Sequence, residues 1–218
     1  MTTAFEDTSA APAVRGFLHT PDAPTGDGFV LTHGAGSNAR APMLIAVADA
    51  FCAAGIAVLR CDLPFRQARP HGPPYPSAAA QDRAGLARAI SVLRERASGK
   101  VYLGGHSYGG RQASMLAAEQ PDIAEALILF SYPLHAPGRA DLRSAHFPKI
   151  AKPVLFIHGT RDPFGSIAEM REATAAIAGP HEIVVIDGAG HDLGGKGSQA
   201  QVAAVAVDAF LHFAKLVP

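Results

Sequence analysis

Six short apolar runs recur along the chain, and none of them alternates apolar with polar positions as a half-exposed strand would. They are short and rich in β-branched residues: Phe29–Thr32, Ile56–Arg60, Val101–Leu103, Leu127–Phe130, Val154–Ile157 and Ile183–Ile186. Strands with this pattern are buried on both faces, as in a parallel sheet covered by helices. Residues Val14–Leu18 are expected to add an antiparallel strand at one edge.

Apolar residues at helical spacing lie in the intervals between these runs, and we interpret each stripe as packing on the core. The stripes are Leu44, Val47, Ala48 and Phe51; Leu86, Ile90, Leu93 and Ala97; Ile167, Met170, Thr174 and Ile177; and Val202, Ala206, Ala209 and Phe213. Alternation of strand and helix predicts an α/β fold, a doubly wound and mostly parallel sheet flanked by helices. Residues 1–13 are predicted to be a flexible tail before a single domain at 14–218, and Pro64–Pro76 an ordered, non-helical loop.

Charge and hydropathy exclude several classes of protein. Nineteen basic and nineteen acidic residues give no net charge and form no blocks, so we expect neither a nucleic-acid nor a membrane partner. The start of the chain lacks the pattern of a signal peptide, and a cytoplasmic location is expected. Cys52 and Cys61 are interpreted as reduced, buried thiols. The oligomeric state is left open.

The segment Gly105-His106-Ser107-Tyr108-Gly109 has the pattern G-x-S-x-G between a predicted strand and a predicted helix. A serine on a sharp turn in that context is a nucleophile elbow, whose Oγ is exposed above the sheet. The glycines allow strand and helix to approach closely. Ser107 is therefore the predicted nucleophile, and His106 is expected to point away from the site.

A serine needs a base and an orienting carboxylate to act as a nucleophile. His191 follows the last predicted strand and precedes the last helix, and Asp162 follows the strand before it. The chain order Ser107, Asp162, His191 is that of an α/β-hydrolase triad. Asp187 is the competing acid, but it lies four residues from His191 on the same loop and would have to fold back.

Acyl transfer also needs donors for the oxyanion, and the predicted donors are the main-chain N–H groups of Tyr108 and Ala35, with Gly36 as second choice. Further residues at strand ends are predicted to line the substrate site: His33, Gly34, Gly36, Tyr132 and His135. Arg66 and Arg69 follow another strand, where they either attract an acidic substrate or are simply solvated.

The motifs HGAG, GHSYGG, HGTRDP and GAGHD together resemble the α/β-hydrolase superfamily from about Val14 to Pro218. The segment Phe130–Pro137 and the motif HGAGSN are similar to a smaller family related to dienelactone hydrolases, which includes a testis-expressed human protein. The resemblance implies a serine hydrolase. Some relatives of this kind have lost triad residues and act as scaffolds, whereas all three positions match here.

Two rival glycine motifs fit less well. The segment Gly34–Ala39 has the dinucleotide-binding spacing, with Asp62 as the matching acid, but its helix starts too late, near Pro42. Gly190–Lys196 resembles a phosphate-binding loop, yet Gly197 replaces the required Ser or Thr. Histidines and acids show no metal-ligand spacing, so no metal is expected.

The sequence thus predicts a cofactor-free serine hydrolase that cleaves an ester, thioester or related acyl bond of a small molecule. The alternative is a catalytically idle hydrolase fold that serves as an interaction module. Only 23 residues separate Phe130 from Val154, where related enzymes insert a cap, so we expect a minimal core with an open, shallow site and no multi-helix lid.

Overall fold

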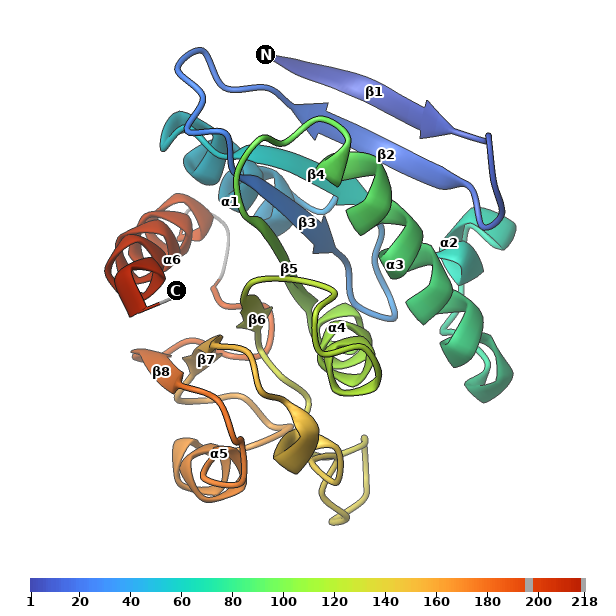
Figure 1. Cartoon of the computed structure of the whole chain (residues 1–218). Coiled ribbons are helices and arrows are strands. Elements are labelled where there is room, and N and C mark those ends of the chain that lie inside the picture. Colours follow the sequence, from blue (N-terminus) through green and yellow to red (C-terminus); the bar gives the residue numbers. More distant parts are fainter. Residues whose placement is uncertain (195–197, 217–218) are drawn as a thin grey trace.

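The computed structural model describes residues 1–194 and 198–216, and the strands of this part form one sheet (Figure 1). The strands are β1 (Thr2–Asp7), β2 (Val14–His19), β3 (Gly28–Thr32), β4 (Ala57–Cys61), β5 (Val101–His106), β6 (Leu127–Phe130), β7 (Val154–Gly159) and β8 (His181–Ile186). Their order is β1-β2-β4-β3-β5-β6-β7-β8. The pairs β1–β2 and β2–β4 are antiparallel and all other pairs are parallel, which confirms the predicted fold class.

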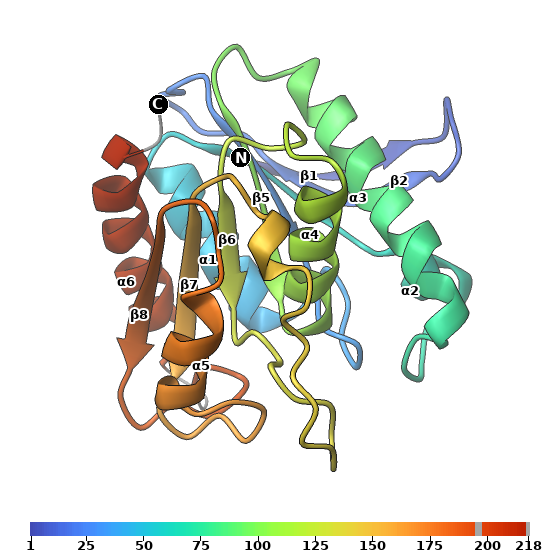
Figure 2. The same cartoon turned by 60° about the horizontal axis from the view of Figure 1, so that its bottom comes forward.

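Helices cover both faces of the sheet (Figure 2). On one face lie α1 (Pro42–Ala53) and α6 (Gln199–Phe213); on the other lie α3 (Ala79–Arg94), α4 (Tyr108–Glu119) and α5 (Ile167–Thr174). The remaining helical segments are α2 (Pro64–Ala68) and the short 3₁₀ turns η1 (Pro76–Ala78), η2 (Phe147–Lys149) and η3 (Ala214–Leu216). None of the described helices is long and apolar enough to cross a membrane.

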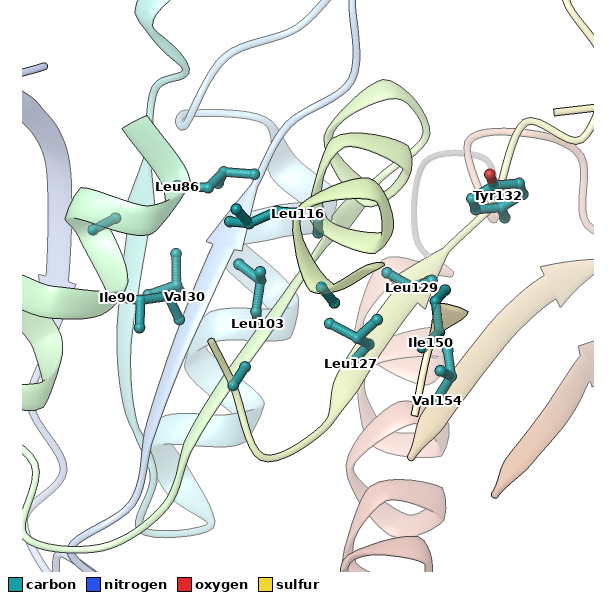
Figure 3. Packing of buried hydrophobic residues seen from close by; sticks show 14 of the residues in the cluster. Val30, Leu86, Ile90, Leu103, Leu116, Leu127, Leu129, Tyr132, Ile150 and Val154 are labelled. Carbon is teal, nitrogen blue, oxygen red and sulfur yellow. The ribbon is translucent and has the colours of Figure 1, made fainter. Parts of the chain in front are cut away.

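The core has two parts, one on each face of the sheet. Figure 3 shows Val30 and Leu103 from the sheet against Ile90 and Leu116 from the helices of one face. The neighbouring strand position, Tyr102, packs in the cluster of the opposite face. Because successive side chains enter different cores, a central strand carries no polar face, and each fully buried aliphatic side chain contributes about 1.5–3 kcal/mol.

Burial is not uniform across the predicted strands. Strands β3, β6 and β7 are buried at every position, as the apolar runs predict. Strand β8 is only partly buried because it forms the edge of the sheet.

The N-terminal residues correct a prediction. Instead of a flexible tail, Thr2–Asp7 form β1, which pairs with β2 from Thr2 opposite His19 to Asp7 opposite Val14. Strand β2 is antiparallel as expected, but it lies inside the sheet because β1 covers its outer edge. The proline-rich loop also differs, since Pro64–Ala68 form helix α2 with Pro64 in its first turn.

No cap covers the sheet in the described part of the chain. Between β6 and β7 the backbone forms a loop, an isolated bridge between His135 and Leu142, and η2. The carboxyl ends of β3, β5, β7 and β8 therefore face a region roofed only by loops. The chain changes winding direction beside β3, and clefts in open α/β sheets form at such points.

Candidate active site

Ser107 sits at the sharp turn between β5 and α4. Its backbone angles are φ 51° and ψ −117°, a conformation that L-residues rarely adopt. The turn depends on glycine: a Cβ on Gly109 would lie 2.5 Å from the His33 carbonyl oxygen, and one on Gly105 would lie 2.9 Å from Gly109 C. The predicted elbow geometry is thus present, with Ser107 at the wall of a cavity.

A chain of hydrogen bonds joins three side chains from three strand ends. His191 Nε2 is 2.8 Å from Ser107 Oγ, and His191 Nδ1 is 2.8 Å from Asp162 Oδ2. Asp162 is buried, and its other carboxylate oxygen accepts a hydrogen bond from the Phe164 N–H at 2.9 Å. The structure therefore brings together the three residues that the sequence selected, in the arrangement that lets an imidazole accept a serine proton.

Asp187, the competing acid, lies outside this chain of hydrogen bonds. Its Oδ1 accepts from Thr160 Oγ1 at 3.2 Å. Asp62 is likewise occupied, since its Oδ1 accepts from the Ala39 N–H at 2.7 Å. The lysine of the phosphate-loop motif, Lys196, lies outside the described residues. Among the described residues there is no group of three His, Cys, Asp or Glu that could hold a metal ion.

His106 does not point away from the site, contrary to the prediction. Its Nε2 lies 2.8 Å from the His191 carbonyl oxygen, and the two rings are 5.2 Å apart. Burial lowers the pKa of His106 to about 4, so at neutral pH the ring is uncharged and Nε2 donates the hydrogen bond. Phe164 packs edge-on with its ring centroid 4.5 Å from that of His191, so the His191 ring contacts two other rings.

The predicted oxyanion donors face the same cavity. Ala35 and Tyr108 both line it, and neither main-chain N–H has a hydrogen-bond partner among the described residues. Tyr108 opens α4, where N–H groups are free and the helix dipole favours negative charge. Its hydroxyl donates to the buried Asp82 at 2.8 Å, which fixes the residue.

Arg66 holds the loop that carries Ala35, and it neither contacts a substrate site nor is solvated. The buried guanidinium donates to the carbonyl oxygens of Ser37 (2.7 Å), Ala35 (2.8 Å) and Gly72 (3.0 Å). Arg69, which is partly exposed, stacks on the Tyr75 ring at 4.2 Å and donates to the Pro73 carbonyl oxygen. Both arginines therefore support the loops that wall the cavity.

The structure places only two of the five predicted lining residues in the cavity, namely Gly34 and Gly36. His33 is fully buried, and its Nε2 accepts from the Leu63 N–H. Tyr132 lies within the apolar core (Figure 3), with its hydroxyl donating to the Arg143 carbonyl oxygen. His135 lies outside the cavity and pairs with Glu169 at 3.1 Å. The residue after a strand end points into the core as readily as into the site, which is why position alone misled the prediction.

The cavity has a volume of about 760 Å³. Lining residues that the sequence did not reveal come from the proline-rich loop, from the start of α3, from α4 and from the loops after β6 and β7: Pro73, Pro74, Tyr75, Pro76, Ala79, Arg111, Gln112, Met115, Pro133, Pro137, Arg143 and Phe164. Arg111 could have been found from its helical spacing, because it lies four residues after Ser107 on the same face of α4.

Two partly buried histidines predict how stability depends on pH. Burial lowers the pKa of His106 and of His146 from 6.5 to about 4, whereas in the unfolded chain both are solvated. Between about pH 6.5 and 4 the unfolded chain binds more protons, so the free energy of unfolding should fall as the pH is lowered through this window. Urea denaturation at pH 7, 6 and 5 measures the slope. His146→Gln should flatten it, and an unchanged slope would contradict the assignment.

The fold and site define a class of protein, and comparison with known proteins agrees. The family model of the alpha/beta hydrolase domain matches residues 26–215, so the chain belongs to the α/β-hydrolase family. It is similar to a dienelactone hydrolase from Anabaena variabilis (26% identity, TM-score 0.78, 97% of each chain covered). An α/β serine hydrolase without lid from Xanthomonas campestris has a similar fold (16% identity, TM-score 0.75, 100% of this chain and 95% of that chain covered). So does an alpha-beta serine hydrolase homologue from Coxiella burnetii (17% identity, TM-score 0.78, 95% of this chain and 96% of that chain covered).

Proposed function

We propose that this hydrolase is a serine esterase or thioesterase that works through an acyl-enzyme. The observation that carries the proposal is the unbroken hydrogen-bonded chain from Asp162 through His191 to Ser107 at the wall of a cavity. The likeness to a dienelactone hydrolase over 97% of both chains supports it.

The reaction would proceed in two steps, acylation of Ser107 and hydrolysis of the acyl-enzyme. Ser107 Oγ attacks the acyl carbon while His191 Nε2 takes its proton, and Asp162 stabilises the imidazolium. The main-chain N–H groups of Ala35 and Tyr108 donate to the oxyanion, and collapse expels the alcohol or thiol with the proton from His191. Water then attacks the acyl-enzyme, again losing a proton to His191, and the acid leaves as Ser107 is restored.

Labelling with a fluorophosphonate probe tests the proposal against the alternative of an idle scaffold. We expect covalent modification of Ser107, found by mass spectrometry of the digested protein, because the probe reacts with activated serines only. A panel of acyl esters and thioesters of graded chain length then ranks substrates. Folded protein that is neither labelled nor active on any ester would favour the scaffold.

Arg66 should act as a positioning residue for the oxyanion loop. Arg66→Met removes the donors to Ser37 and Ala35, so the Ala35 N–H should lose its alignment and kcat should fall about 10- to 100-fold with little change in KM. Steady-state kinetics measures kcat and KM separately, with kcat normalised to the fraction of protein that the fluorophosphonate probe labels. Arg66→Lys keeps the charge and some of the donors, and should recover part of kcat. A loss confined to KM would contradict this role.

A further inference from the structure

The active-site cavity is lined by two arginines that lack an anionic partner among the described residues. Arg111 on α4 and Arg143 on the loop between β6 and β7 both line the cavity. Neither guanidinium makes a hydrogen bond or an ion pair with any described residue, and Arg111 Nε is buried without a partner. Burial and the charge of Arg111 together lower the pKa of Arg143, as expected when two guanidinium groups lie close.

The backbone of α4 places Arg111 near the nucleophile. The Arg111 N–H donates to the Ser107 carbonyl oxygen at 2.9 Å, so the two residues are one helical turn apart on the same face. Four residues span about 6 Å along a helix, and long side chains on helices point back toward the N-terminus. Arg111 and Ser107 are therefore close neighbours that line the same cavity.

Arg143 is held in place from both sides of its backbone. Its N–H donates to the Leu134 carbonyl oxygen at 2.8 Å, and its own carbonyl oxygen accepts from the buried Tyr132 hydroxyl at 2.6 Å. The bridge between His135 and Leu142 pairs the residue just before Arg143 with the other arm of the loop. The loop thus presents this cation at a fixed position on the cavity wall.

Acidic residues near this wall are paired with other cations. Asp141 pairs with Arg139 at 2.7 Å, and Glu119 pairs with Arg83 at 2.9 Å. Gln112, fully buried beside Arg111, accepts from Arg83 through Oε1 and keeps Nε2 without a partner. Arg111 and Gln112 therefore keep donors without a partner among the described residues, and partly buried cations are costly unless an anion compensates them.

Because both guanidinium groups line the same cavity, we propose that Arg111 and Arg143 form a carboxylate-binding subsite, and that the substrate is an ester or thioester with a second, free carboxylate. A guanidinium matches a carboxylate with two parallel hydrogen bonds, and both arginines line the cavity that also contains Ser107. The inference rests on the proposed serine-hydrolase function for its chemistry, but the binding can be tested without turnover.

Hydrolysis of matched ester pairs tests the substrate class. The first pair is p-nitrophenyl hemiglutarate and p-nitrophenyl butyrate, in which the anionic ester carries its carboxylate in the acyl part. The second pair is 4-acetoxybenzoate and phenyl acetate, in which the anionic ester carries its carboxylate in the alcohol part. We expect at least one pair to show a kcat/KM preference of about tenfold or more for the anionic ester, weakened by salt. Arg111→Gln and Arg143→Gln should each abolish this ratio, whereas Arg139→Gln, on the same loop but away from the cavity, should keep it. Equal rates within both pairs would overturn the proposal.

Calorimetry of glutarate binding to Ser107→Ala tests the carboxylate subsite in a protein that lacks the proposed nucleophile. We expect saturable binding that weakens about tenfold or more in Ser107→Ala/Arg111→Gln and is unchanged in Ser107→Ala/Arg139→Gln. If glutarate binds to Ser107→Ala but the unmodified protein cleaves no ester, the proposed hydrolase function is wrong and the carboxylate subsite is supported. If esters are cleaved but glutarate does not bind, or if inorganic phosphate binds more tightly than glutarate, the carboxylate subsite is wrong.

Discussion

Replacing Ser107 by alanine should reduce ester hydrolysis by on the order of 10⁶-fold in kcat, close to the uncatalysed background. The loss is this large because the acyl-enzyme cannot form without Oγ, and the remaining base and oxyanion donors act only on water. Release of p-nitrophenol from p-nitrophenyl acetate or butyrate measures the rate. Circular dichroism should show an intact fold, since the change removes one oxygen atom at the cavity wall.

Ser114 offers a matched control on the same helix. Its Oγ also lies 2.8 Å from a histidine nitrogen, His146 Nε2, but the residue is fully buried and is not among the residues that line the cavity. Ser114→Ala should therefore keep its hydrolytic activity and its fluorophosphonate labelling. If Ser107→Ala retained turnover while Ser114→Ala lost it, the proposed nucleophile would be wrong.

Asp162→Asn should lower kcat by about 10⁴-fold while leaving the fold unchanged. An asparagine can still accept the Phe164 N–H through Oδ1, and it then presents its NH₂ group to His191 Nδ1. The imidazole is forced into the tautomer with its proton on Nε2, which cannot accept the proton of Ser107. Steady-state kinetics and thermal unfolding together separate this loss from a loss of stability.

Asp187→Asn is the control for the choice of acid. Asp187 bonds Thr160 at the exposed end of β8, so its replacement should change kcat less than twofold, as expected of a surface substitution away from the site. A large loss in Asp187→Asn combined with a mild effect of Asp162→Asn would reverse the assignment.

Much of the fold could be predicted from the local pattern because the central strands are buried on both faces. Leu127–Phe130 and Val154–Ile157 read as uninterrupted apolar runs for that reason, and both are strands in the structure. Residues 2–7 (TTAFED) carry no such signal, because an edge strand exposes most of its side chains and is held by backbone hydrogen bonds to β2. Backbone pairing has little effect on side-chain composition, so the apolar pattern does not predict β1.

The sequence by itself determined which three side chains could form a hydrogen-bonded relay, since chain order and strand ends constrain Ser107, Asp162 and His191 together. Only the tertiary structure decided what surrounds them. His106 and His191 are 85 residues apart, yet their rings pack together, and Arg111 and Arg143 line the same cavity from a helix and a separate loop. Such contacts depend on the direction of individual side chains after packing, which a one-dimensional pattern does not encode; for the same reason His33 and Tyr132 are buried in the interior instead of lining the site.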